Sequence, residues 1–360
     1  MRTLKENIID RIRKEGPMSF RSFMDTCLYD PEWGYYNARQ ERIGKQGDFY
    51  TSPCISPLFG EMVARQIEEC WALMGKPPFT IVEYGAGPGH LCRDILIALK
   101  PNDALYSGLR YCIIEQSAGM QKAEKELLPE KVSWHSGILD IPDLQGCVLS
   151  NELLDNFPVH QVVMQQELME VFVDYREPEE FAELLRPASP QLKEYFRGLE
   201  VSLPLGFRTE VNLQMIPWIR DIARALQRGF LITIDYGSYS SALYDEKRRQ
   251  GTLLCYHRHT INDNPYARPG EQDITAHVNF SALNRWGERF GLSSLGLTSQ
   301  FRFLQGLGLA ARLRELAVDR QKHAAAAFLM DLSARIKVFV QQKGLGLCPL
   351  SGLQFARYQA

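Results

Sequence analysis

The sequence predicts an α/β fold, with a largely parallel sheet and helices on both of its faces. Short apolar runs typical of buried strands alternate with amphipathic helical patterns through the middle of the chain. A glycine-rich turn directly follows the first of these strands, as it does in sheets that bind a ligand at the carboxyl ends of their strands. The chain has 360 residues, of which 45% are hydrophobic, so it is long enough to bury a large core.

The first 60 residues predict an N-terminal helical extension and a loop that covers a ligand. Residues 3–15 carry apolar side chains at helical spacing, and Gly16-Pro17 ends that helix. Ser19 is a suitable N-cap for a second helix. The stretch 30–57 is rich in Gly, Tyr and Pro and is long for a connection without secondary structure, which is typical of a functional loop.

Strands and helices then alternate in the main domain, which is expected over residues 61–360. Each strand is separated from the next by a helix or a long connection, and such crossovers are what parallel strands require. The predicted helices cover 58–75, 91–99 and 117–128, and the predicted strands cover 79–84, 109–115, 132–135, 147–151 and 230–236.

Two polar segments interrupt this alternation, and the last third of the chain differs again. The segments at about 165–225 and 237–280 are expected to be insertions over the sheet. The C-terminal part is expected to be helical, with a long helix over 322–342. This helix is expected to pack on the core or, alternatively, on a partner or a second copy in a homodimer. The apolar residues that predict it are Phe328, Leu332, Ile336 and Phe339.

Charge and cysteine usage narrow the function classes. The chain has 41 Lys+Arg against 43 Asp+Glu, a net charge of −2, which argues against a dedicated nucleic-acid binder. No apolar run is long enough to span a bilayer. The eight cysteines contain no CxxC pair, so we expect buried reduced thiols and no metal. The start of the chain has no apolar leader, and a cytoplasmic protein is expected.

The strongest single motif is the stretch 81–91, Ile-Val-Glu-Tyr-Gly-Ala-Gly-Pro-Gly-His-Leu. The dinucleotide fingerprint G-x-G-x-x-G would place its third glycine at His90, and Pro88 removes an amide donor that a pyrophosphate needs. The pattern therefore favours S-adenosylmethionine (SAM), with its sulfonium and amino-acid tail, over NAD. The cofactor-binding candidates in this stretch are Glu83, Gly85, Gly87 and Gly89.

Two further acids follow the next strands. Glu115 ends the second strand, where a carboxylate can accept hydrogen bonds from both ribose hydroxyls, in SAM and NAD enzymes alike. Asp140 follows the third strand, at the loop that commonly meets the adenine amino group in SAM enzymes. The alternative for each acid is a solvated loop carboxylate or a helix cap.

Several blocks, taken in order, make the sequence similar to the MidA-like family of SAM-dependent methyltransferases. The resemblance implies a class I methyltransferase fold, Rossmann-like with a mostly parallel seven-stranded sheet, and SAM as methyl donor. Mitochondrial members of that family are complex I assembly factors that methylate a protein arginine. The blocks are Leu28-Tyr29-Asp30-Pro31, Gly34-Tyr35-Tyr36, residues 47–53, 56–60 and 150–159, Ile234-Asp235-Tyr236-Gly237, Gly251-Thr252-Leu253 and residues 273–278.

The fourth strand leads to the catalytic candidates, Glu152 and Asp155. Paired carboxylates can hold a guanidinium through two hydrogen bonds and localise its charge on one nitrogen. If 151–156 begins a helical turn, these acids lie at i and i+3 on one face. The alternative is simple stabilisation of a helix N-terminus. Asn151 is a candidate contact for cofactor or substrate.

Candidates outside these strands complete the predicted site. Asp48 is expected to bind the methionine amino group and Thr51 a carboxylate or ribose, unless this block only packs on the sheet edge. Asp235, Tyr236 and His257 are candidate substrate-binding residues, with a turn or hydrogen-bonded loop histidines as the alternative.

Together these observations predict a SAM-dependent methyltransferase whose best-supported acceptor is a protein arginine, on a respiratory complex I subunit if the resemblance extends that far. Two alternatives remain at this point. One is methylation of a small molecule or another side chain on the same fold. The other is a SAM-binding assembly factor that performs little catalysis.

Overall fold

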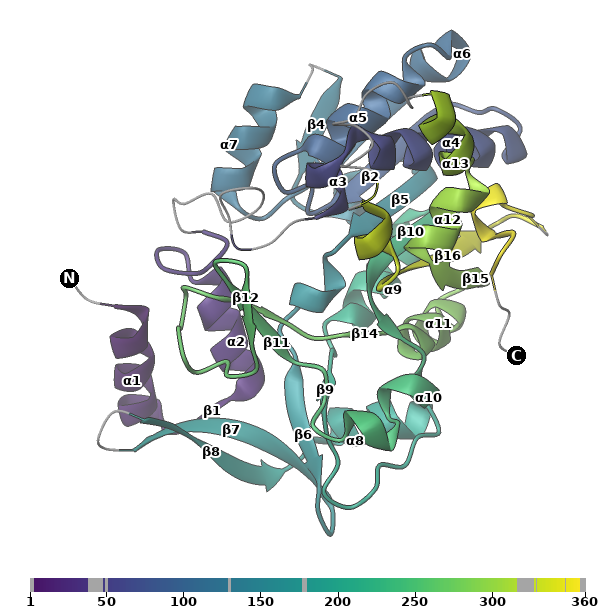
Figure 1. Ribbon diagram of the computed structural model, residues 1–360. Helices are drawn as coiled ribbons and strands as arrows, with labels where there is room; N and C mark the ends of the chain where they lie inside the picture. Colours follow the sequence, from purple (N-terminus) through teal and green to yellow (C-terminus); the bar gives the residue numbers. More distant parts are fainter. Residues whose placement is uncertain are drawn as a thin grey trace. The chain divides into compact units, whose positions relative to one another are not determined.

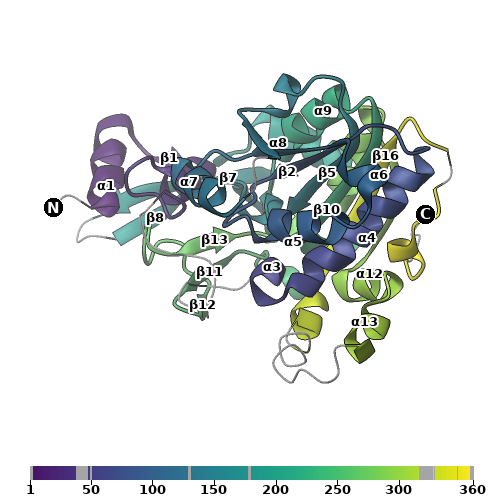
Figure 2. The same ribbon diagram turned by 90° about the horizontal axis from the view of Figure 1, so that it is seen from above.

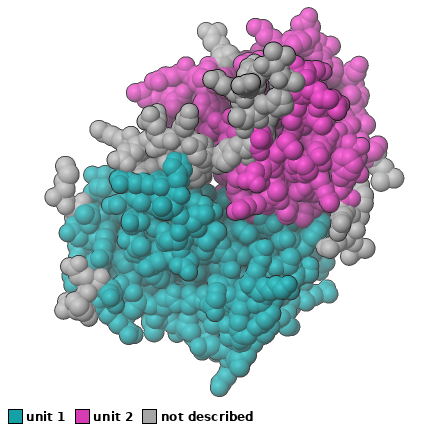
Figure 3. All heavy atoms as spheres, viewed as in Figure 1, with its two compact units in different colours: residues 1–49, 154–217, 237–285 teal, residues 50–153, 218–236, 286–360 magenta. Residues whose placement is uncertain are grey.

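The structure is a computed structural model that describes residues 3–37, 48, 51–128, 131–176, 180–315, 327, 329–346 and 348–356. The chain divides into two compact units, coloured separately in Figure 3. Each unit is assembled from three separate stretches of chain. Unit 1 contains Met1–Phe49, Leu154–Pro217 and Gly237–Arg285, and unit 2 contains Tyr50–Leu153, Trp218–Tyr236 and Trp286–Ala360.

Unit 2 is built on a mostly parallel sheet with the strand order β15-β16-β10-β5-β2-β3-β4 (Figure 1). The strands from β10 to β4 run parallel to one another, and β16 is antiparallel to both of its neighbours. An eighth strand, β14 (Val278–Asn279), pairs with the last residues of β10. The seven strands of the main path are β2 (Phe79–Tyr84), β3 (Leu109–Ile114), β4 (Val132–His135), β5 (Gln145–Asn151), β10 (Arg228–Ser238), β15 (Ser293–Ser299) and β16 (Ile336–Lys343).

Helices cover both faces of this sheet, as Figure 2 shows for α4 and α5 on one face and α9 on the other. Helix α4 begins where the Ser56 hydroxyl accepts a hydrogen bond from the Leu58 amide, and Pro57 suits its first position. The helices are α3 (Ser52–Ile55), α4 (Pro57–Leu73), α5 (His90–Leu99), α6 (Asp103–Tyr106), α7 (Ala118–Leu127), α9 (Met215–Ala225), α11 (Phe280–Arg289), α12 (Gln300–Gly306) and α13 (Leu309–Glu315), with 3-10 turns at Ile138–Asp140 and Ser351–Leu353.

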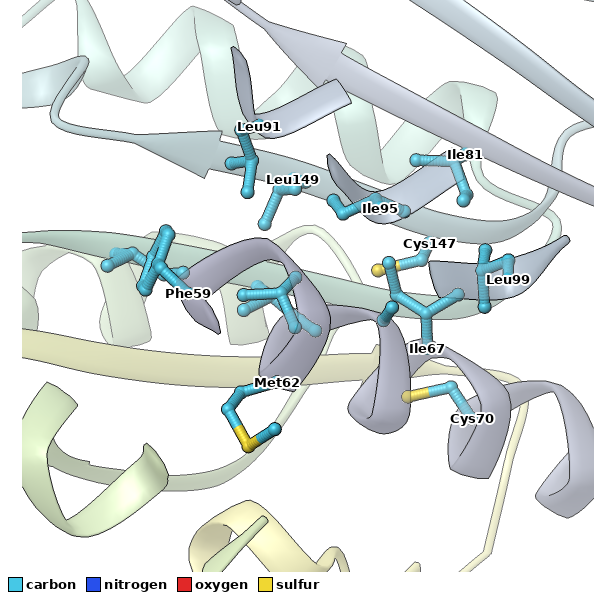
Figure 4. Packing of buried hydrophobic residues seen from close by; sticks show 14 of the residues in the cluster. Phe59, Met62, Ile67, Cys70, Ile81, Leu91, Ile95, Leu99, Cys147 and Leu149 are labelled. Atoms are coloured by element: carbon cyan, nitrogen blue, oxygen red, sulfur yellow. The ribbon is translucent and has the colours of Figure 1, made fainter. Parts of the chain in front are cut away.

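The core of unit 2 forms where α4 and α5 meet the sheet (Figure 4). Phe59 and Ile67 of α4 belong to the same cluster as Ile95 of α5 and Leu149 of β5, and all four side chains are fully buried. Burying a side chain of this size is worth about 2 kcal/mol. This packing holds the strand ends at which the candidate site residues lie.

The long C-terminal helix predicted over 322–342 is wrong. Residues 329–333 are helical, but Ile336–Lys343 forms β16, an interior strand of the sheet between β15 and β10. Val338, Phe339 and Val340 are consecutive and all buried, which a strand covered on both faces requires and a one-sided helix does not. Phe328 lies outside the described residues.

Unit 1 combines the helices α1, α2, α8 and α10 with two small antiparallel sheets. Helix α1 (Leu4–Glu15) begins with a capping box between Thr3 and Glu6, and it packs through the apolar stripe that the sequence predicts. In the larger sheet, β7 pairs with β1, β6 and β8, and β6 also pairs with β9. The remaining elements are β1 (Met18–Ser19), α2 (Phe20–Tyr29), a 3-10 turn at Leu154–Asn156, β6 (His160–Met164), β7 (Leu168–Arg176), β8 (Glu180–Pro187), α8 (Pro190–Gly198), β9 (Arg208–Val211), α10 (Ser240–Leu243), a 3-10 turn at Glu246–Arg248, β11 (Leu254–His257), β12 (Thr260–Asn262) and β13 (Asp273–Thr275).

Candidate active site

The glycine-rich turn between β2 and α5 is shaped by three left-handed glycines. Gly85, Gly87 and Gly89 have φ values of 62°, 55° and 82°, which side chains with a Cβ rarely adopt. A Cβ on Gly85 would also lie only 2.8 Å from the side chain of Leu153. The turn therefore presents bare backbone beside the start of α5, as a site for close approach of a ligand requires.

Glu83 lies beneath this turn and is almost fully buried. Its carboxylate accepts a hydrogen bond of 2.6 Å from the Tyr111 hydroxyl. Burial raises the pKa of Glu83 to about 8.

A second buried acid, Glu124 of α7, was missed by the sequence analysis. It accepts a hydrogen bond of 2.6 Å from the Trp134 indole, and burial raises its pKa to about 7. Its charge also helps to raise the pKa of Glu83. The available signal was an acid on the inward face of the predicted helix 117–128, together with a tryptophan in the following strand.

Glu115 and Asp140 occupy the predicted strand ends of unit 2. Glu115 follows β3, and one of its carboxylate oxygens accepts a hydrogen bond of 2.7 Å from the Ser117 amide. Partial burial raises the pKa of Glu115. Asp140 is exposed in a 3-10 turn, where it accepts a hydrogen bond of 2.7 Å from the Ser136 hydroxyl.

Glu152 directly follows β5 and has a strained backbone. Its φ of 50° is unusual for a residue other than glycine, and its amide donates to the carbonyl of Ile234 at 2.8 Å. Its carboxylate accepts hydrogen bonds from the Ser52 amide at 3.4 Å and the Asn151 side chain at 3.2 Å. Burial and the nearby charge of Asp235 raise its pKa to about 8.

The acid that faces Glu152 within unit 2 is Asp235, at the end of the adjacent strand β10. Asp235 is fully buried, and its two oxygens accept hydrogen bonds from the Leu153 amide at 3.1 Å and the Tyr236 amide at 2.8 Å. The condition for placing Glu152 and Asp155 on one helical face is not met, because the backbone of Glu152 is left-handed and the 3-10 turn covers only Leu154–Asn156. Two parallel strand ends bring the carboxylates of Glu152 and Asp235 together instead.

Thr51 and Tyr236 complete the predicted residues of unit 2. Thr51 precedes α3, and its hydroxyl donates to the sulfur of Cys54 at 3.2 Å. Tyr236 is half-buried and packs against the hydrophobic core. Neither contact selects a ligand by itself.

The remaining predicted residues, Asp48, Asp155 and His257, belong to unit 1. Asp48 accepts hydrogen bonds from the Tyr35 hydroxyl at 2.8 Å and the Arg258 amide at 2.5 Å, and His257 lies 4.0 Å from it. Arg258 is in the left-handed region, so Asp48 stabilises a strained turn between β11 and β12. Both oxygens of Asp48 thus have partners other than a cofactor.

A polar cluster in unit 1 was also missed. The Tyr36 hydroxyl lies 2.9 Å from a carboxylate oxygen of Asp273 and 2.7 Å from the side-chain nitrogen of Asn156. Burial raises the pKa of Asp273 to about 7. Tyr36, Asn156 and Asp273 all lie in the sequence blocks that carry the family resemblance, which was the signal that singled them out.

The residues of unit 2 fit a nucleoside cofactor with a charged tail. The glycine turn leaves room for backbone contact, and Glu115 ends the strand next to it. The side-chain oxygen of Asn151 is buried, and none of the described residues hydrogen-bonds to it. Among the same residues, no group of three or more His, Cys, Asp or Glu side chains is placed to hold a metal ion. No helix in the described part of the chain is long and apolar enough to cross a membrane.

Known proteins resemble this chain in sequence and structure. A family model described as "Putative S-adenosyl-L-methionine-dependent methyltransferase" matches residues 62–298. "Protein arginine methyltransferase NDUFAF7 homolog, mitochondrial" of Drosophila melanogaster is 29% identical over 351 residues, which cover 87% of this chain and 77% of that protein. The human "Protein arginine methyltransferase NDUFAF7, mitochondrial" is 28% identical over 400 residues, which cover 98% and 85% respectively. A crystal structure of a Burkholderia thailandensis protein bound to S-adenosyl-homocysteine matches with a TM-score of 0.88 and 30% identity, covering 98% of this chain and 95% of that one.

These comparisons correct one prediction. A cytoplasmic location was expected from the absence of an apolar leader, but the fly, mouse and human relatives are all named as mitochondrial proteins. The cytoplasmic prediction is therefore wrong by the measure of the relatives. An apolar leader marks secretion, so its absence says little about import into an organelle.

Proposed function

Because the chain belongs to the S-adenosyl-L-methionine-dependent methyltransferases, we propose that it transfers the methyl group of SAM to an arginine side chain of a protein. The family match confirms the predicted fold class, the SAM cofactor and the enzyme class. The arginine acceptor is supported by relatives that are named protein arginine methyltransferases. The observation that carries the proposal in this chain is the carboxylate pair Glu152 and Asp235, at the ends of β10 and of β5, which pairs with the strand β2 that leads into the glycine turn.

The pair has the chemistry that a guanidinium needs. A guanidinium is permanently charged and its lone pairs are delocalised, so each nitrogen is a poor nucleophile. Two carboxylates at neighbouring strand ends can hold it through charge-assisted hydrogen bonds and localise the charge on one nitrogen. SAM supplies a methyl group that is bound to a sulfonium. When the S–C bond breaks, its two electrons stay on the sulfur. The protein aligns the acceptor nitrogen and excludes water.

Forming the new N–C bond releases one proton from the guanidinium. Glu152 is placed to accept it, since its pKa is raised to about 8 and a general base works best near the operating pH. The positive charge of the acceptor favours the ionised form of Glu152 when substrate binds. Asp235 contributes negative charge, and its backbone hydrogen bonds fix its orientation.

For the cofactor we propose Gly85, Gly87 and Gly89 as the backbone cradle and Glu115 as the acceptor for the ribose hydroxyls. Asp140, Asn151, Glu83 and Thr51 are proposed to complete the site in unit 2. Asp48 is assigned to the turn between β11 and β12 instead of the methionine amino group, because its oxygens are already hydrogen-bonded. Tyr236 is proposed to line the acceptor path in unit 2, whereas the roles predicted for Asp155 and His257 of unit 1 stay predictions. A respiratory-complex subunit is the proposed acceptor protein, on the strength of the family resemblance.

The test is labelled methyl transfer from SAM to an extract of cells that lack this chain, followed by amino-acid analysis of the product. We expect label on arginine with the wild-type chain. Glu152→Gln should lower the initial rate at least about 100-fold, because it removes the proton acceptor and one charge of the pair. Its affinity for S-adenosyl-homocysteine, measured by calorimetry, should stay within about twofold.

Glu126→Gln is the matched control, because it removes an exposed acid on α7. It should keep the wild-type rate. Label on lysine, on a small molecule or on no acceptor would contradict the arginine proposal. A wild-type rate in Glu152→Gln would contradict the proposed role of that residue.

A further inference from the structure

A buried glutamine far along the chain is hydrogen-bonded to the segment that contacts Glu152. Gln300 begins α12 and is fully buried. Its side-chain nitrogen donates to the hydroxyl of Ser52 at 2.8 Å and to the hydroxyl of Ser333 at 2.6 Å. Both serines are also fully buried. Three segments of unit 2 that are distant in sequence thus meet at one amide.

The orientation of this amide follows from its partners. The Ser333 hydroxyl donates to the carbonyl of Leu329 at 2.6 Å, so toward Gln300 it can only accept. Gln300 must therefore present its nitrogen to the serines. None of the described residues hydrogen-bonds to the side-chain oxygen of Gln300, although that oxygen is buried. The side chain is held only through its two N–H groups, which is a costly arrangement in a core.

Ser52 connects this amide to the candidate catalytic acid. The backbone amide of Ser52 donates to the carboxylate of Glu152 at 3.4 Å. Ser52 is the first residue of α3, a helix of four residues, and the N-cap residue Thr51 makes no side-chain capping hydrogen bond. Among the described residues, Gln300 is the hydrogen-bond partner of the Ser52 hydroxyl.

We propose that Gln300 is a positioning residue for methyl transfer, which fixes Ser52 so that the Ser52 amide holds the carboxylate of Glu152 in place. The inference rests on the proposed function, in which Glu152 binds the acceptor guanidinium and accepts a proton from it. Gln300 itself touches neither reactant. Its role is to keep an N–H group aimed at an acid whose backbone is strained and whose neighbour, Asp235, repels it.

The consequence is a defined change in pH dependence. The Ser52 amide lowers the pKa of Glu152, while burial and Asp235 raise it. Among the described residues, Cys54 of α3 is a further titratable group that interacts with this carboxylate. Loss of the Ser52 contact removes the hydrogen bond that lowers the pKa of Glu152. The acid limb of the rate profile should then move to higher pH, because a larger share of Glu152 stays protonated.

The experiment compares Gln300→Leu with Gln66→Leu in the full chain, using labelled transfer to the same cell extract. Gln66 is an equally buried glutamine of α4 in unit 2, whose side chain bonds to Glu69 and to the Gly352 amide. Both variants lose buried hydrogen bonds, so both should lose stability. Only Gln300→Leu should lower the maximal rate, by about tenfold, and move the acid limb to higher pH. The KM for SAM should stay within about twofold in both.

Ser52→Ala provides a second variant that does not depend on the folding of Gln300→Leu. It removes the hydroxyl that Gln300 binds but keeps the amide that meets Glu152. It should shift the profile in the same direction, and the double variant should lose no more activity than Gln300→Leu alone.

Equal profiles for Gln300→Leu and Gln66→Leu, or an unshifted profile for Ser52→Ala, would overturn the inference while Glu152→Gln remained inactive. A fully active Glu152→Gln would overturn the proposed function instead. The two failures are therefore distinguishable.

Discussion

Glu152 has a strained backbone and lies in surroundings that disfavour its negative charge. Its φ of 50° costs roughly 1–3 kcal/mol for a side chain with a Cβ. Its carboxylate is also beside a second acid, so burial and repulsion both disfavour its charged form. A bound guanidinium would relieve both electrostatic penalties. These properties suit a residue that is organised for a cation and not for the stability of the free protein.

Glu115 allows a residue-scale test of cofactor binding. Replacing it with alanine should weaken binding of S-adenosyl-homocysteine by roughly 10- to 100-fold, since hydrogen bonds to a charged acceptor are worth about 1.5–3 kcal/mol. Isothermal titration calorimetry of the full chain measures this directly. The affinity of Glu115→Gln for S-adenosyl-homocysteine should lie between those of the wild type and Glu115→Ala. This variant keeps an acceptor for the Ser117 amide but loses an acceptor for the ribose.

The Glu126→Gln variant should bind S-adenosyl-homocysteine like the wild type and serves as the control here too. Wild-type affinity in Glu115→Ala would show that the ribose is held elsewhere. A response to NAD in place of S-adenosyl-homocysteine would contradict the proposed use of the glycine turn.

Some site residues could be predicted from the sequence, and the reason is local. Glu83 is the penultimate residue of β2 and Glu115 directly follows β3, and a strand followed by a turn is visible as an apolar run with a polar end. Pairing of Glu152 with Asp235 was not predictable in this way, because it depends on which strands become neighbours. Gln300 carries no local signal, and the signal for Glu124 does not identify its partner, since a polar side chain inside an apolar pattern gives no indication of what it will contact.

At the scale of elements, β16 marks the limit of periodicity arguments. Leu332, Ile336 and Phe339 are spaced as on a helix, and an Ala-rich stretch precedes them. The run from Ile336 to Val340 is also β-branched or aromatic at every position except Lys337, which favours a buried strand. The sheet decides between the two, because β10 and β15 each need an antiparallel partner between them. Such long-range pairing is not encoded in any short window of sequence.

Hydrogen exchange followed by mass spectrometry tests the assignment of β16. Residues 337–342 are paired on both sides, with β10 and β15, so their amides should exchange as slowly as those of β5. In the described residues, β8 pairs only with β7, and its amides should exchange at least about tenfold faster. Fast exchange over 336–343 would contradict the strand assignment and favour a helix or an unpaired segment.

At the scale of the whole molecule, the buried acids make stability depend on pH in a specific direction. Burial raises the pKa of Glu83 to about 8 and that of Glu124 and Asp273 to about 7. The folded state therefore binds protons that the unfolded state releases from about pH 4 upward. The stability that these groups contribute is fully present below that pH and is lost as the pH rises through 7 and 8.

We expect the free energy of unfolding to be lower at pH 8.5 than at pH 6. Glu83→Gln should reduce this fall by roughly 2 kcal/mol, because a neutral amide has no proton to lose and still accepts from Tyr111. Urea unfolding followed by tryptophan fluorescence reports mainly on unit 2, which holds four of the five tryptophans. If the free energy of unfolding of Glu83→Gln falls between pH 6 and pH 8.5 as much as that of the wild type, Glu83 is ionised in the folded protein.

The position of β16 has a consequence for synthesis of the chain. The backbone edge of β10 from Gly229 to Tyr236 pairs with Ile336–Lys343, which the ribosome delivers about 100 residues later. At 5–20 residues per second, the nascent sheet would expose this edge for roughly 5–20 s. An unpaired strand edge can pair with other chains, so the nascent protein should depend on a chaperone during this interval. A premature stop anywhere before Ile336 would make the exposure permanent and yield an aggregate instead of a smaller enzyme.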